Sequence, residues 1–360
     1  MTDGERIQNC ISRILAWYPA VRRPLPWRGN PTPYAVWISE IMLQQTRIEA
    51  VIPYYARFLS ELPDVRALAE VGEDRLLKLW EGLGYYSRAR NLQKAAKRIM
   101  ADFGGELPRT AAELRTLPGI GDYTAGAVAS IAYGEPEPAV DGNVLRVLAR
   151  VLACAEDVQL PQTRRRMAEL LRAAYPAGEA AGLLTEGLME LGETVCVPNG
   201  EARCADCPLA ELCLARQRGD VERYPVRTPP RPRRIEERTV LLLRAGARWA
   251  VRQREEKGLL ARMWEFPNRD GALTAAEAAE AVRALGGDVL SVEACGEARH
   301  VFTHVEWHMT GFLLTLAGEC GDYVWRSADE IRAECSIPTA FRFYLKQIKR
   351  AAAFSQQLNA

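Results

Sequence analysis

Histidine is scarce in this sequence of 360 residues: it occurs three times, always at or after position 300. A serine or cysteine nucleophile activated by histidine is therefore excluded from the part of the chain before His300. Any acid–base chemistry in that part must come from carboxylates, tyrosines or lysines.

Long apolar runs and a strong charge imbalance are also missing. No apolar run reaches the roughly 20 residues that cross a bilayer, and the N-terminal MTDGERIQNC lacks a signal-peptide pattern. The net charge of +1 excludes a chain that is basic throughout, although a local basic surface would still suit nucleic acid. We expect a cytoplasmic, nucleoid-associated monomer with no membrane partner.

The distribution of apolar residues divides the chain into two predicted domains. Residues 1–222 have apolar positions at helical spacing and little strand alternation, which predicts an all-α domain. Residues 223–238, with four prolines and six arginines, predict an extended basic linker. Residues 239–360 predict a mixed α and β domain, with strands around a turn at 239–255, a strand pair at 304–316 and a helix at 274–287.

A tight turn followed by a helix of small residues is predicted around LPGIG, Leu117–Gly121. Gly121 has no side chain to keep a partner from the backbone. The helix that begins near Asp122 presents unpaired N–H groups at the turn, and these favour an anion such as a DNA phosphate. A plain helix–helix corner would explain the same residues.

One carboxylate, Asp141, follows this helix within YGEPEPAVDGNV. It suits the N-cap of the next predicted helix, and capping would hold the side chain in a fixed direction. Asn143 is placed to orient either the carboxylate or a water molecule.

A second carboxylate, Glu40, lies on the apolar side of a helix predicted over residues 33–55. Burial would raise the pKa of Glu40 and allow it to act as a general acid near neutral pH. A buried ion pair with Arg28 or Arg47, or a tilted helix that leaves Glu40 in water, would also account for it.

The segments LPGIG and YGEPEPAVDGNV together resemble the helix-hairpin-helix and following aspartate loop of the endonuclease III superfamily of base-excision DNA glycosylases. PWRGNPTPYAVWISEIMLQQT, residues 26–46, and GLGYYSRARNL, residues 82–92, resemble more narrowly the MutY-type adenine DNA glycosylases. The resemblance implies hydrolysis of the N-glycosidic bond of adenine in double-stranded DNA, opposite 8-oxoguanine or guanine.

The resemblance also implies roles for individual residues. Glu40 would protonate the adenine leaving group and Asp141, assisted by Asn143, would stabilise the positive charge on the sugar. Bifunctional relatives carry a strand-cleaving lysine where this sequence has Tyr123, so a monofunctional enzyme is expected, with Tyr123 hydrogen-bonding near Asp141. Core packing is the alternative for Tyr123.

Further residues are implied in the contact with DNA and the extruded base. The expected base pocket consists of Trp27, Arg28, Leu43 and Glu186. The expected DNA contacts are Gln45, Leu83, Tyr85, Gly119 and Gly121.

Four of the nine cysteines lie within 18 residues: Cys196, Cys204, Cys207 and Cys213, spaced C-x7-C-x2-C-x5-C. Four thiolates at this density suit zinc or a 4Fe–4S cluster. The resemblance favours one 4Fe–4S cluster bound by the loop 196–213, although the first gap has seven residues where the family commonly has six.

The second domain resembles the Nudix-like C-terminal domain of MutY-type enzymes. Its predicted helix lacks the paired glutamates of a working Nudix hydrolase, so a recognition domain is expected. Phe302, Thr303 and His304 correspond to the Phe-Ser-His loop that contacts 8-oxoguanine in that family. The spacing of His300, His304 and His308 would suit a metal site on a helix, but alternating apolar residues predict a strand there.

Two other functions fit parts of the sequence. One is a sibling glycosylase that removes a different base, such as mismatched thymine. The other is a non-catalytic DNA-binding protein in which the two acids only cap helices.

Overall fold

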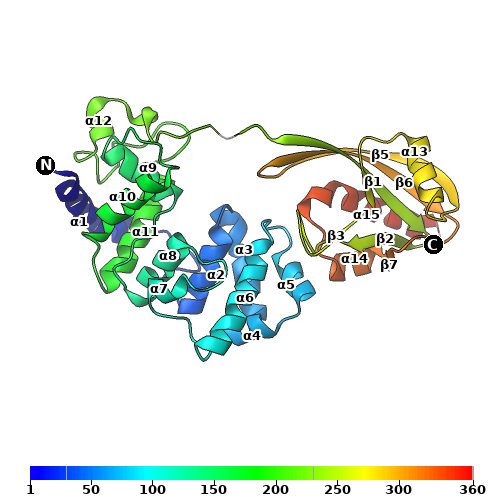
Figure 1. Ribbon diagram of the computed structural model, residues 1–360, viewed down its shortest axis with the longest axis horizontal. Helices are drawn as coiled ribbons and strands as arrows, with labels where there is room; N and C mark the ends of the chain where they lie inside the picture. Colours follow the sequence, from blue (N-terminus) through cyan, green and yellow to red (C-terminus); the bar gives the residue numbers. More distant parts are fainter. Residues whose placement is uncertain (30, 230, 359–360) are drawn as a thin grey trace. The chain divides into compact units, whose positions relative to one another are not determined.

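The computed structural model describes residues 1–29, 31–229 and 231–358. Its contacts divide the chain into two compact units (Figure 1). The first comprises Met1–Glu70 and Arg90–Pro229, and the second comprises Val71–Ala89 with the described residues after Pro229.

The first unit is built from helices, as the apolar spacing predicts. Its elements are α1 (Asp3–Val21), α2 (Pro33–Leu43), α3 (Ile48–Glu61), α4 (Val65–Glu70), most of α6 (Ser87–Asp102), α7 (Ala111–Leu114), α8 (Asp122–Tyr133), α9 (Gly142–Val151), α10 (Pro161–Arg172), α11 (Glu179–Thr194), α12 (Leu214–Arg218) and the short 3-10 turn η1 (Val221–Arg223).

The single helix predicted over residues 33–55 is wrong, because the structure has α2 and α3 with a turn between them. Gln45 in this turn has a left-handed φ of +56°, and the Thr46 N–H donates to the Leu43 carbonyl at 3.2 Å. The Gln44 amide donates to Thr124 Oγ1 of α8 at 3.1 Å. This tertiary contact fixes the direction of the chain at the break, although the local residues favour a continuous helix.

The small residues of α8 allow neighbouring backbone to approach it closely. A Cβ added at Gly126 would lie 2.4 Å from the carbonyl oxygen of Pro138, which belongs to the segment before Asp141. On α11, a Cβ at Gly192 would lie 2.6 Å from Cβ of Asn143. Both glycines therefore let the chain around the start of α9 pack closely against α8 and α11.

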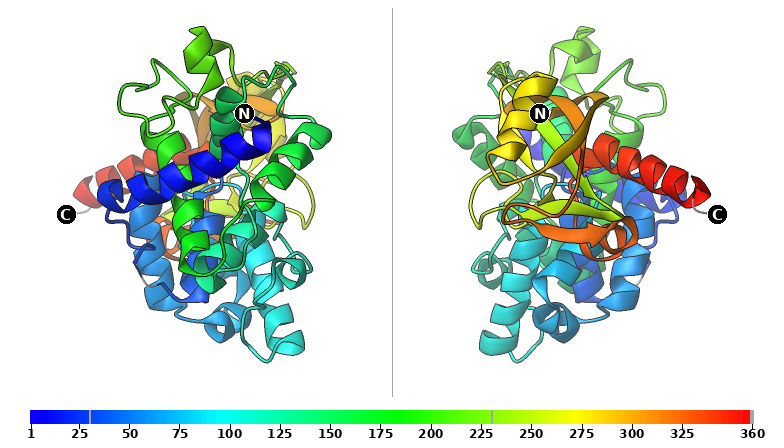
Figure 2. Two further views of the ribbon diagram at one scale, coloured as in Figure 1. Left: turned by 90° about the vertical axis from the view of Figure 1, so that its left-hand side faces the viewer. Right: turned by 90° about the vertical axis from the view of Figure 1, so that its right-hand side faces the viewer.

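The second unit is a mixed sheet with helices on both faces (Figures 1 and 2). The strands are β1 (Arg234–Ala245), β2 (Arg248–Gln253), β3 (Trp264–Glu265), β4 (Asn268–Asp270), β5 (Val289–Val301), β6 (Val305–Leu316) and β7 (Val324–Ser327). The helical elements are α5 (Glu73–Trp80), α13 (Ala275–Arg283), α14 (Ala328–Glu334), η2 (Thr339–Phe341) and α15 (Arg342–Leu358).

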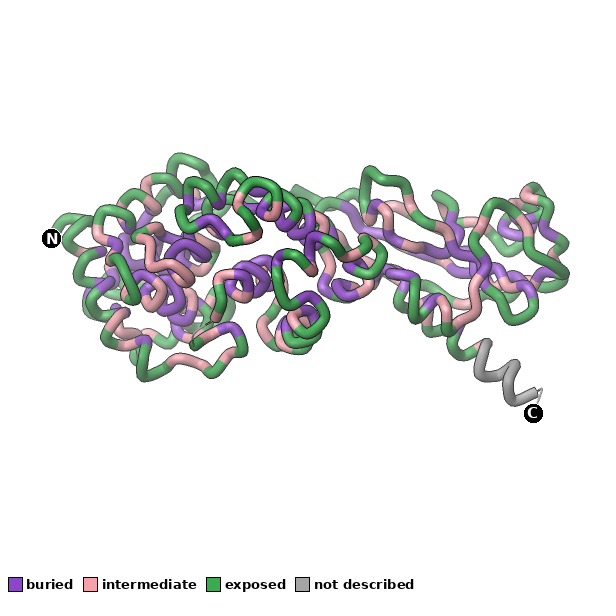
Figure 3. The backbone as a smooth tube through the Cα atoms, turned by 90° about the horizontal axis from the view of Figure 1, so that it is seen from below, coloured by how far each residue is buried: buried purple, intermediate pink, exposed green. Residues whose placement is uncertain are grey.

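The strand order is β3-β2-β1-β6-β5, with β4 paired to β1 and β7 paired to β2. Strand β1 runs parallel to β6, and the other pairs are antiparallel. Val240 and Leu242 belong to the core with Trp307, whereas Leu241 and Leu243 belong to the core beneath α13. This burial on both faces explains the uninterrupted apolar run of β1. Figure 3 shows buried backbone segments in both units.

Two features differ from the sequence predictions. Strand β1 begins at Arg234, inside the predicted linker, because Arg234–Arg238 pair with Val305–Met309 of β6. Residues 305–316 form the single strand β6, not a strand pair, and its antiparallel partner is β5. Gly311 makes room for Tyr344, whose ring would lie 2.2 Å from an added Cβ, so this glycine serves packing and not a turn.

Residues 71–89 pack with the mixed sheet unit although they are part of the helical stretch of the sequence. Lys78 Nζ donates to the carbonyl of Cys335 at 3.0 Å, and Glu81 Oε1 accepts the N–H of Ile337 at 3.0 Å. Among the described residues, no helix is both long and apolar enough to cross a membrane.

Candidate active site

Glu40 is buried in α2, with an exposed fraction of 4%. The Tyr123 hydroxyl donates to its Oε2 atom at 2.6 Å. Burial raises the pKa of Glu40 to about 7, and the Tyr123 hydrogen bond opposes that rise. The negative charges of Asp141 and Glu186 raise this pKa further. Glu40 is therefore not in water, and a carboxyl in this environment can hold and release a proton at neutral pH.

Asp141 is the N-cap of α9, as the sequence predicts. Its Oδ1 accepts the Val144 N–H at 2.8 Å, and its Oδ2 accepts Nδ2 of Asn143 at 2.9 Å. Burial raises the pKa of Asp141, while these hydrogen bonds favour its ionised form. The carboxylate is thus aimed by two donors and retains free lone pairs for a positively charged group.

Tyr123, in the first turn of α8, is close enough to both acids for their charges to act on its hydroxyl. Burial raises the pKa of its hydroxyl well above the usual value, and the charges of Glu40 and Asp141 raise it further. The hydroxyl is therefore a proton donor at neutral pH. The hydroxyl donates to Glu40 and to the sulfur of Met189, at 3.8 Å, so the acid that accepts its hydrogen bond is Glu40.

The four residues expected in the base pocket all belong to the first unit. Trp27 is buried with its ring edge-on to Tyr55, at 5.4 Å between centroids. Leu43 is the last residue of α2 and is partly buried. Arg28 does not pair with Glu40: its Nη2 lies 2.7 Å from Oε2 of Glu190.

Glu186, on α11, is buried and held by two donors. The Tyr18 hydroxyl donates to it at 2.8 Å, and Arg22 Nη2 lies 3.0 Å from the same oxygen. The charge of Glu186 raises the pKa of Glu40. This effect indicates that Glu186 lies near Glu40 within the first unit.

Glu190 was not identified from the sequence, although it is almost fully buried beside Arg28. Arg23 Nε donates to its Oε1 at 2.5 Å, so two arginines share this carboxylate. The signal that would have indicated it is its position one helical turn after Glu186, which places both glutamates on the same side of α11.

Arg146 was also missed, and it connects Asn143 to the cysteine segment. Its Nη2 donates to Oδ1 of Asn143 and to the Gly192 carbonyl, both at 2.8 Å. Its Nε donates to the Cys196 carbonyl at 2.8 Å. The available sequence signal was an arginine within the largely apolar run of α9, and the structure shows that this arginine is buried.

The four clustered cysteines line one cavity, together with apolar side chains including Val195 and Val221. Arg150 Nη1 donates to Sγ of Cys196 at 3.2 Å. Among the described residues, no three His, Cys, Asp or Glu side chains are arranged to hold a metal ion. Arg150, Arg203 and Arg216 also line the cavity. A set of four thiols around one cavity suits a sulfur-liganded group.

The predicted hairpin is present before α8. Gly119 has φ of +79°, and a Cβ added there would lie 2.6 Å from Cβ of Asn91. Gly121 is exposed, and among the described residues no heavy atom lies within 4 Å of an added Cβ. The turn therefore requires Gly119, while Gly121 leaves the N-terminus of α8 accessible.

Two residues expected to contact DNA have left-handed backbone conformations. Gln45, in the first unit, has φ of +56° and is exposed. Tyr85, in the second unit, has φ of +48° and an exposed fraction of 48%, whereas neighbouring Leu83 is buried. Strain of this kind in non-glycine residues is common at functional sites.

The segment 302–304 joins β5 to β6 within the second unit. Phe302 packs edge-on against His300 and Trp307, at 4.6 and 4.9 Å between centroids. Thr303 and His304 are exposed, and Thr303 Oγ1 lies 3.2 Å from the Tyr85 hydroxyl. His300 and His308 lie on strands, as the alternation predicts.

Comparison with protein families finds two matches in this chain. Residues 38–173 match the HhH-GPD superfamily of base excision DNA repair proteins, and residues 239–347 match the NUDIX domain. Two solved structures resemble the helical part. A thermostable thymine-DNA glycosylase has a TM-score of 0.54 and 27% identity, covering 59% of this chain and 98% of that one. Endonuclease III in a non-covalent complex with DNA has a TM-score of 0.51 and 25% identity, covering 61% and 99%.

Curated relatives extend the similarity to both parts of the chain. The adenine DNA glycosylase of Homo sapiens is 35% identical over 309 residues, covering 71% of this chain and 56% of the human protein. That of Mus musculus is 34% identical over 353 residues, covering 82% of this chain and 68% of the mouse protein. The chain thus spans about half of the human relative and two thirds of the mouse relative. With its helix-hairpin-helix and Nudix-like parts, the chain belongs to the adenine DNA glycosylase family of base excision DNA repair proteins.

Proposed function

We propose that the protein is a monofunctional DNA glycosylase that hydrolyses the N-glycosidic bond of adenine opposite 8-oxoguanine or guanine. The observation that carries this proposal is the pairing of two differently tuned carboxyl groups around Tyr123. Glu40 is buried with a pKa of about 7, and Asp141 is fixed by hydrogen bonds that favour its charge.

Glu40 is the proposed general acid. Adenine leaves a sugar slowly unless a ring nitrogen is protonated, and a carboxyl that is protonated near neutral pH can supply that proton. A positioned general acid contributes roughly 10² to 10⁴ in rate. The Tyr123 hydroxyl holds the Oε2 atom, which directs the other oxygen of Glu40 to the leaving base.

Asp141 is the proposed anion beneath the sugar. The sugar develops positive charge as the bond to adenine breaks, and a nearby carboxylate stabilises that charge or bonds to it transiently. Hydrogen-bond donors from Val144 and Asn143 fix the direction of the carboxylate. Arg146 in turn donates a hydrogen bond to Asn143 and fixes its side chain. Water then completes the hydrolysis and leaves an abasic site.

Strand cleavage is not part of the proposed reaction. Cleavage in bifunctional relatives needs an amine that forms a Schiff base with the sugar. Tyr123 has no amine, and its hydroxyl remains protonated next to Glu40. The intact abasic strand is therefore the expected product.

The substrate proposed is double-stranded DNA with the adenine turned out of the helix, at a cost of a few kcal/mol. The accessible hairpin at Gly119 and Gly121 would bind the backbone. Gln45, Leu83 and Tyr85 would enter the base stack or support the residues that do. Trp27, Arg28, Leu43 and Glu186 would surround the extruded adenine.

Phe302, Thr303 and His304 are proposed to contact the base opposite adenine. Two observations support this proposal. Thr303 and His304 are exposed, and Thr303 contacts Tyr85, which has a left-handed backbone conformation. The second unit would then act in lesion recognition and the first unit in base removal.

The four cysteines Cys196, Cys204, Cys207 and Cys213 are proposed to hold one 4Fe–4S cluster. When bound, the cluster would fix the loop 196–213 and its contact with DNA. The hydrolytic step belongs to Glu40 and Asp141, and Arg146 and Asn143 connect the cysteine segment to Asp141 by hydrogen bonds. The protein is proposed to act as a monomer on the DNA of the cytoplasm.

A product assay on three duplexes tests the function. The duplexes carry adenine opposite 8-oxoguanine, adenine opposite guanine, and thymine opposite guanine. Abasic sites from the first two, without strand breaks before alkali, are expected. Product only from the third would identify a thymine glycosylase, and no product despite duplex binding would identify a non-catalytic DNA-binding protein.

A further inference from the structure

The loop of residues 82–86, between α5 and α6, has an unusual backbone. Gly82, Gly84 and Tyr85 have φ angles of +108°, +71° and +48°. Glycine adopts such angles freely, whereas a tyrosine in this region is strained. Tyr85 therefore keeps its left-handed conformation because neighbouring groups hold the loop.

Arg88, on α6, is bonded to three successive peptide groups around Tyr85. Its Nη2 donates to the carbonyls of Leu83 and Gly84, both at 3.1 Å. Its backbone N–H donates to the Tyr85 carbonyl at 2.9 Å. The Trp80 ring adds another donor, because its Nε1 lies 3.2 Å from the Gly84 carbonyl oxygen. The peptide groups on both sides of the Tyr85 Cα are thus fixed by groups of the chain itself.

The guanidinium group of Arg88 also contacts two aromatic rings. Its carbon atom lies 5.3 Å from the centroid of the Trp80 ring and 5.6 Å from that of the Tyr85 ring. The Tyr85 hydroxyl lies 3.2 Å from Oγ1 of Thr303. The Tyr85 ring is thus held at its face and at its hydroxyl, although 48% of the residue is exposed. An exposed aromatic ring in a fixed orientation is suited to stacking on a base.

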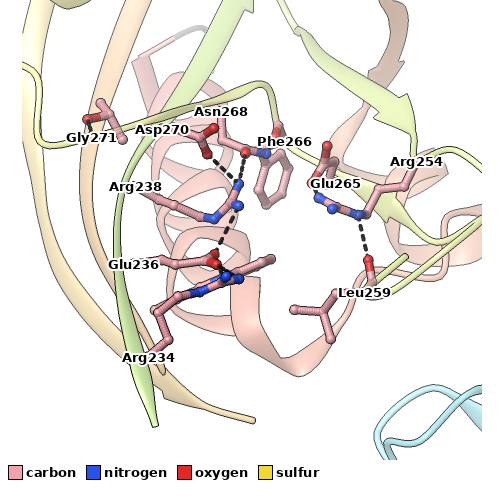
Figure 4. Close-up of polar contacts among 12 residues, drawn as sticks. Arg234, Glu236, Arg238, Arg254, Leu259, Glu265, Phe266, Asn268, Asp270 and Gly271 are labelled. Atoms are coloured by element: carbon pink, nitrogen blue, oxygen red, sulfur yellow. Dashed lines mark hydrogen bonds and ion pairs between the residues drawn. The ribbon is translucent and has the colours of Figure 1, made fainter. Parts of the chain in front are cut away.

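The burial of Arg88 is costly, and two other arginines of the second unit show how such a cost is usually offset. Arg238 and Arg254 pair with the carboxylates of Asp270 and Glu265 (Figure 4). Arg88 is buried, with 8% exposed, and its Nη2 atom is directed to main-chain carbonyls. Burial lowers the pKa of Arg88 to about 10, so it outweighs the interactions that favour the charge. A buried charge retained at this cost is typical of a functional position.

We propose that Arg88 is a positioning residue for base extrusion, which holds the Tyr85 ring in the orientation that enters the base stack. The inference rests on the proposed function, because it assigns a cause to the proposed entry of Tyr85 into DNA. A loop that is ordered before binding loses little conformational entropy when its ring stacks on a base. Without the Arg88 contacts, the chain would still bind a duplex but would have to order this loop during extrusion.

Substitutions at Arg88 separate its charge from its geometry. A planar guanidinium donates to two carbonyls while it lies on aromatic rings, whereas an ammonium group is compact and strongly hydrated. Arg88→Lys should therefore retain the charge but only part of the order of the loop. Arg88→Met removes the charge and the side-chain donors and keeps an unbranched stem. Lys97→Met, at an exposed position of the same helix, is the matched control for the loss of charge.

Hydrogen exchange in the free chain tests the order of the loop without DNA. The amide hydrogens of Gly82 and Leu83 are the reporters, because each is hydrogen-bonded locally. Arg88→Met should speed their exchange at least about tenfold, because two hydrogen bonds to the loop are lost. Arg88→Lys should have a smaller effect, and Lys97→Met should stay within about twofold of the unmodified chain.

Single-turnover base removal tests whether this order serves extrusion. The substrate is a duplex with adenine opposite 8-oxoguanine, and the chain is at saturating concentration so that the rate does not depend on affinity. Arg88→Met should lower the rate at least about tenfold with Tyr85 present, but less than about twofold in a chain that carries Tyr85→Ala. A merely structural role would lower both rates alike. Arg88→Lys should restore part of the rate, Lys97→Met should leave it unchanged, and circular dichroism checks folding.

Three outcomes would overturn the inference: unchanged exchange of the loop in Arg88→Met, equal loss of rate with and without Tyr85, or an equal loss in Lys97→Met. A full rate in Tyr85→Ala would also overturn it, because Arg88 would then hold no residue that acts in extrusion. Absence of base removal by the unmodified chain would refute the proposed function and this inference with it. Base removal by the unmodified chain and by Arg88→Met at the same rate would refute this inference alone.

Discussion

At the scale of single residues, the two acids differ because their surroundings differ. Glu40, on α2, is buried and accepts a hydrogen bond from Tyr123 of α8, and its pKa is about 7. Asp141 is also buried, but a backbone N–H and the Asn143 amide stabilise its charge. Two identical functional groups can thus serve as a proton donor and as an anion at one pH.

The pH dependence of base removal tests the protonation of Glu40. The rate should fall as pH rises through about 7, because the ionised acid cannot protonate adenine. The Tyr123 hydrogen bond lowers the pKa of Glu40, so Tyr123→Phe should move this fall to higher pH. Single-turnover rates measured across the neutral range give both profiles. A fall that stays at the same pH in Tyr123→Phe would contradict this assignment.

The pH dependence of protein stability should also reflect the protonation of Glu40. The pKa of Glu40 rises from 4.5 to about 7 on folding, so the folded state binds the proton more tightly. Stability should decrease as pH rises from 4.5 to about 7, by about 3 kcal/mol from this group. Glu40→Gln should remove that decrease.

Urea unfolding at several pH values measures this difference. Glu201→Gln, at an exposed position, serves as the control and should keep the pH dependence of the unmodified chain. Parallel loss of stability in Glu40→Gln and the unmodified chain over this range would contradict the rise in the pKa of Glu40 on folding.

Sequence reasoning located the two acids but not all of their partners. Glu40 and Asp141 were indicated by a polar residue on an apolar face and by a family motif. The acceptor of the Tyr123 hydrogen bond, the pairing of Arg28 with Glu190 and the link through Arg146 depend on how α8, α9 and α11 pack. A single sequence does not specify such contacts between distant segments.

At the scale of elements, glycines determine how closely the helices approach. Gly126 admits the Pro138 carbonyl against α8, and Gly192 admits Asn143 against α11. The hairpin before α8 uses Gly119 for a left-handed turn. These positions explain why the stretch from Leu117 to Val144 has so many small residues.

The two hairpin glycines provide a matched pair of variants. Gly119→Ala should destabilise the protein by about 1–3 kcal/mol, because φ is +79° and Asn91 is in the way. Gly121→Ala should change stability by less than about 0.5 kcal/mol, because its added Cβ meets open space. Thermal unfolding measures both effects.

The affinity of the variants for a DNA duplex should also distinguish the role of Gly121 from that of Gly119. Gly121→Ala should weaken duplex binding while the fold is retained, because its methyl group would stand where a phosphate approaches. Full affinity in a folded Gly121→Ala variant would exclude a hairpin contact with DNA.

The elements themselves were largely predictable, and their interruptions were not. The helix after the hairpin and the helix capped by Thr274 have strong local signals. The break at Gln45 depends on the contact of Gln44 with Thr124, and the role of Gly311 depends on Tyr344. Local residues favoured a continuous helix in the first case and a turn in the second.

At the scale of the whole molecule, each unit has its own core. The mixed unit also includes α5, through contacts of Lys78 and Glu81 with the backbone near Cys335 and Ile337. The sequence predicted the change from helical to mixed structure, but not that residues 71–89 would pack with the second unit. That association joins segments separated by more than half of the chain.

A chain that ends at residue 229 tests whether base removal and lesion recognition belong to different units. It should still remove some adenine but discriminate less between 8-oxoguanine and guanine, because segment 302–304 is lost. It should also be less stable near α5, whose partners are removed. Product assays on both duplexes and hydrogen exchange of α5 provide the measurements. Unchanged discrimination would refute a recognition role for the second unit.

The account depends most on Glu40 and Asp141 acting on one extruded nucleotide. Single-turnover base removal from a duplex with adenine opposite 8-oxoguanine, with duplex binding measured in parallel, tests this most directly. Glu40→Gln and Asp141→Asn should each lower the rate at least about 10²-fold while both variants bind the duplex. Substantial base removal by either variant would contradict the account.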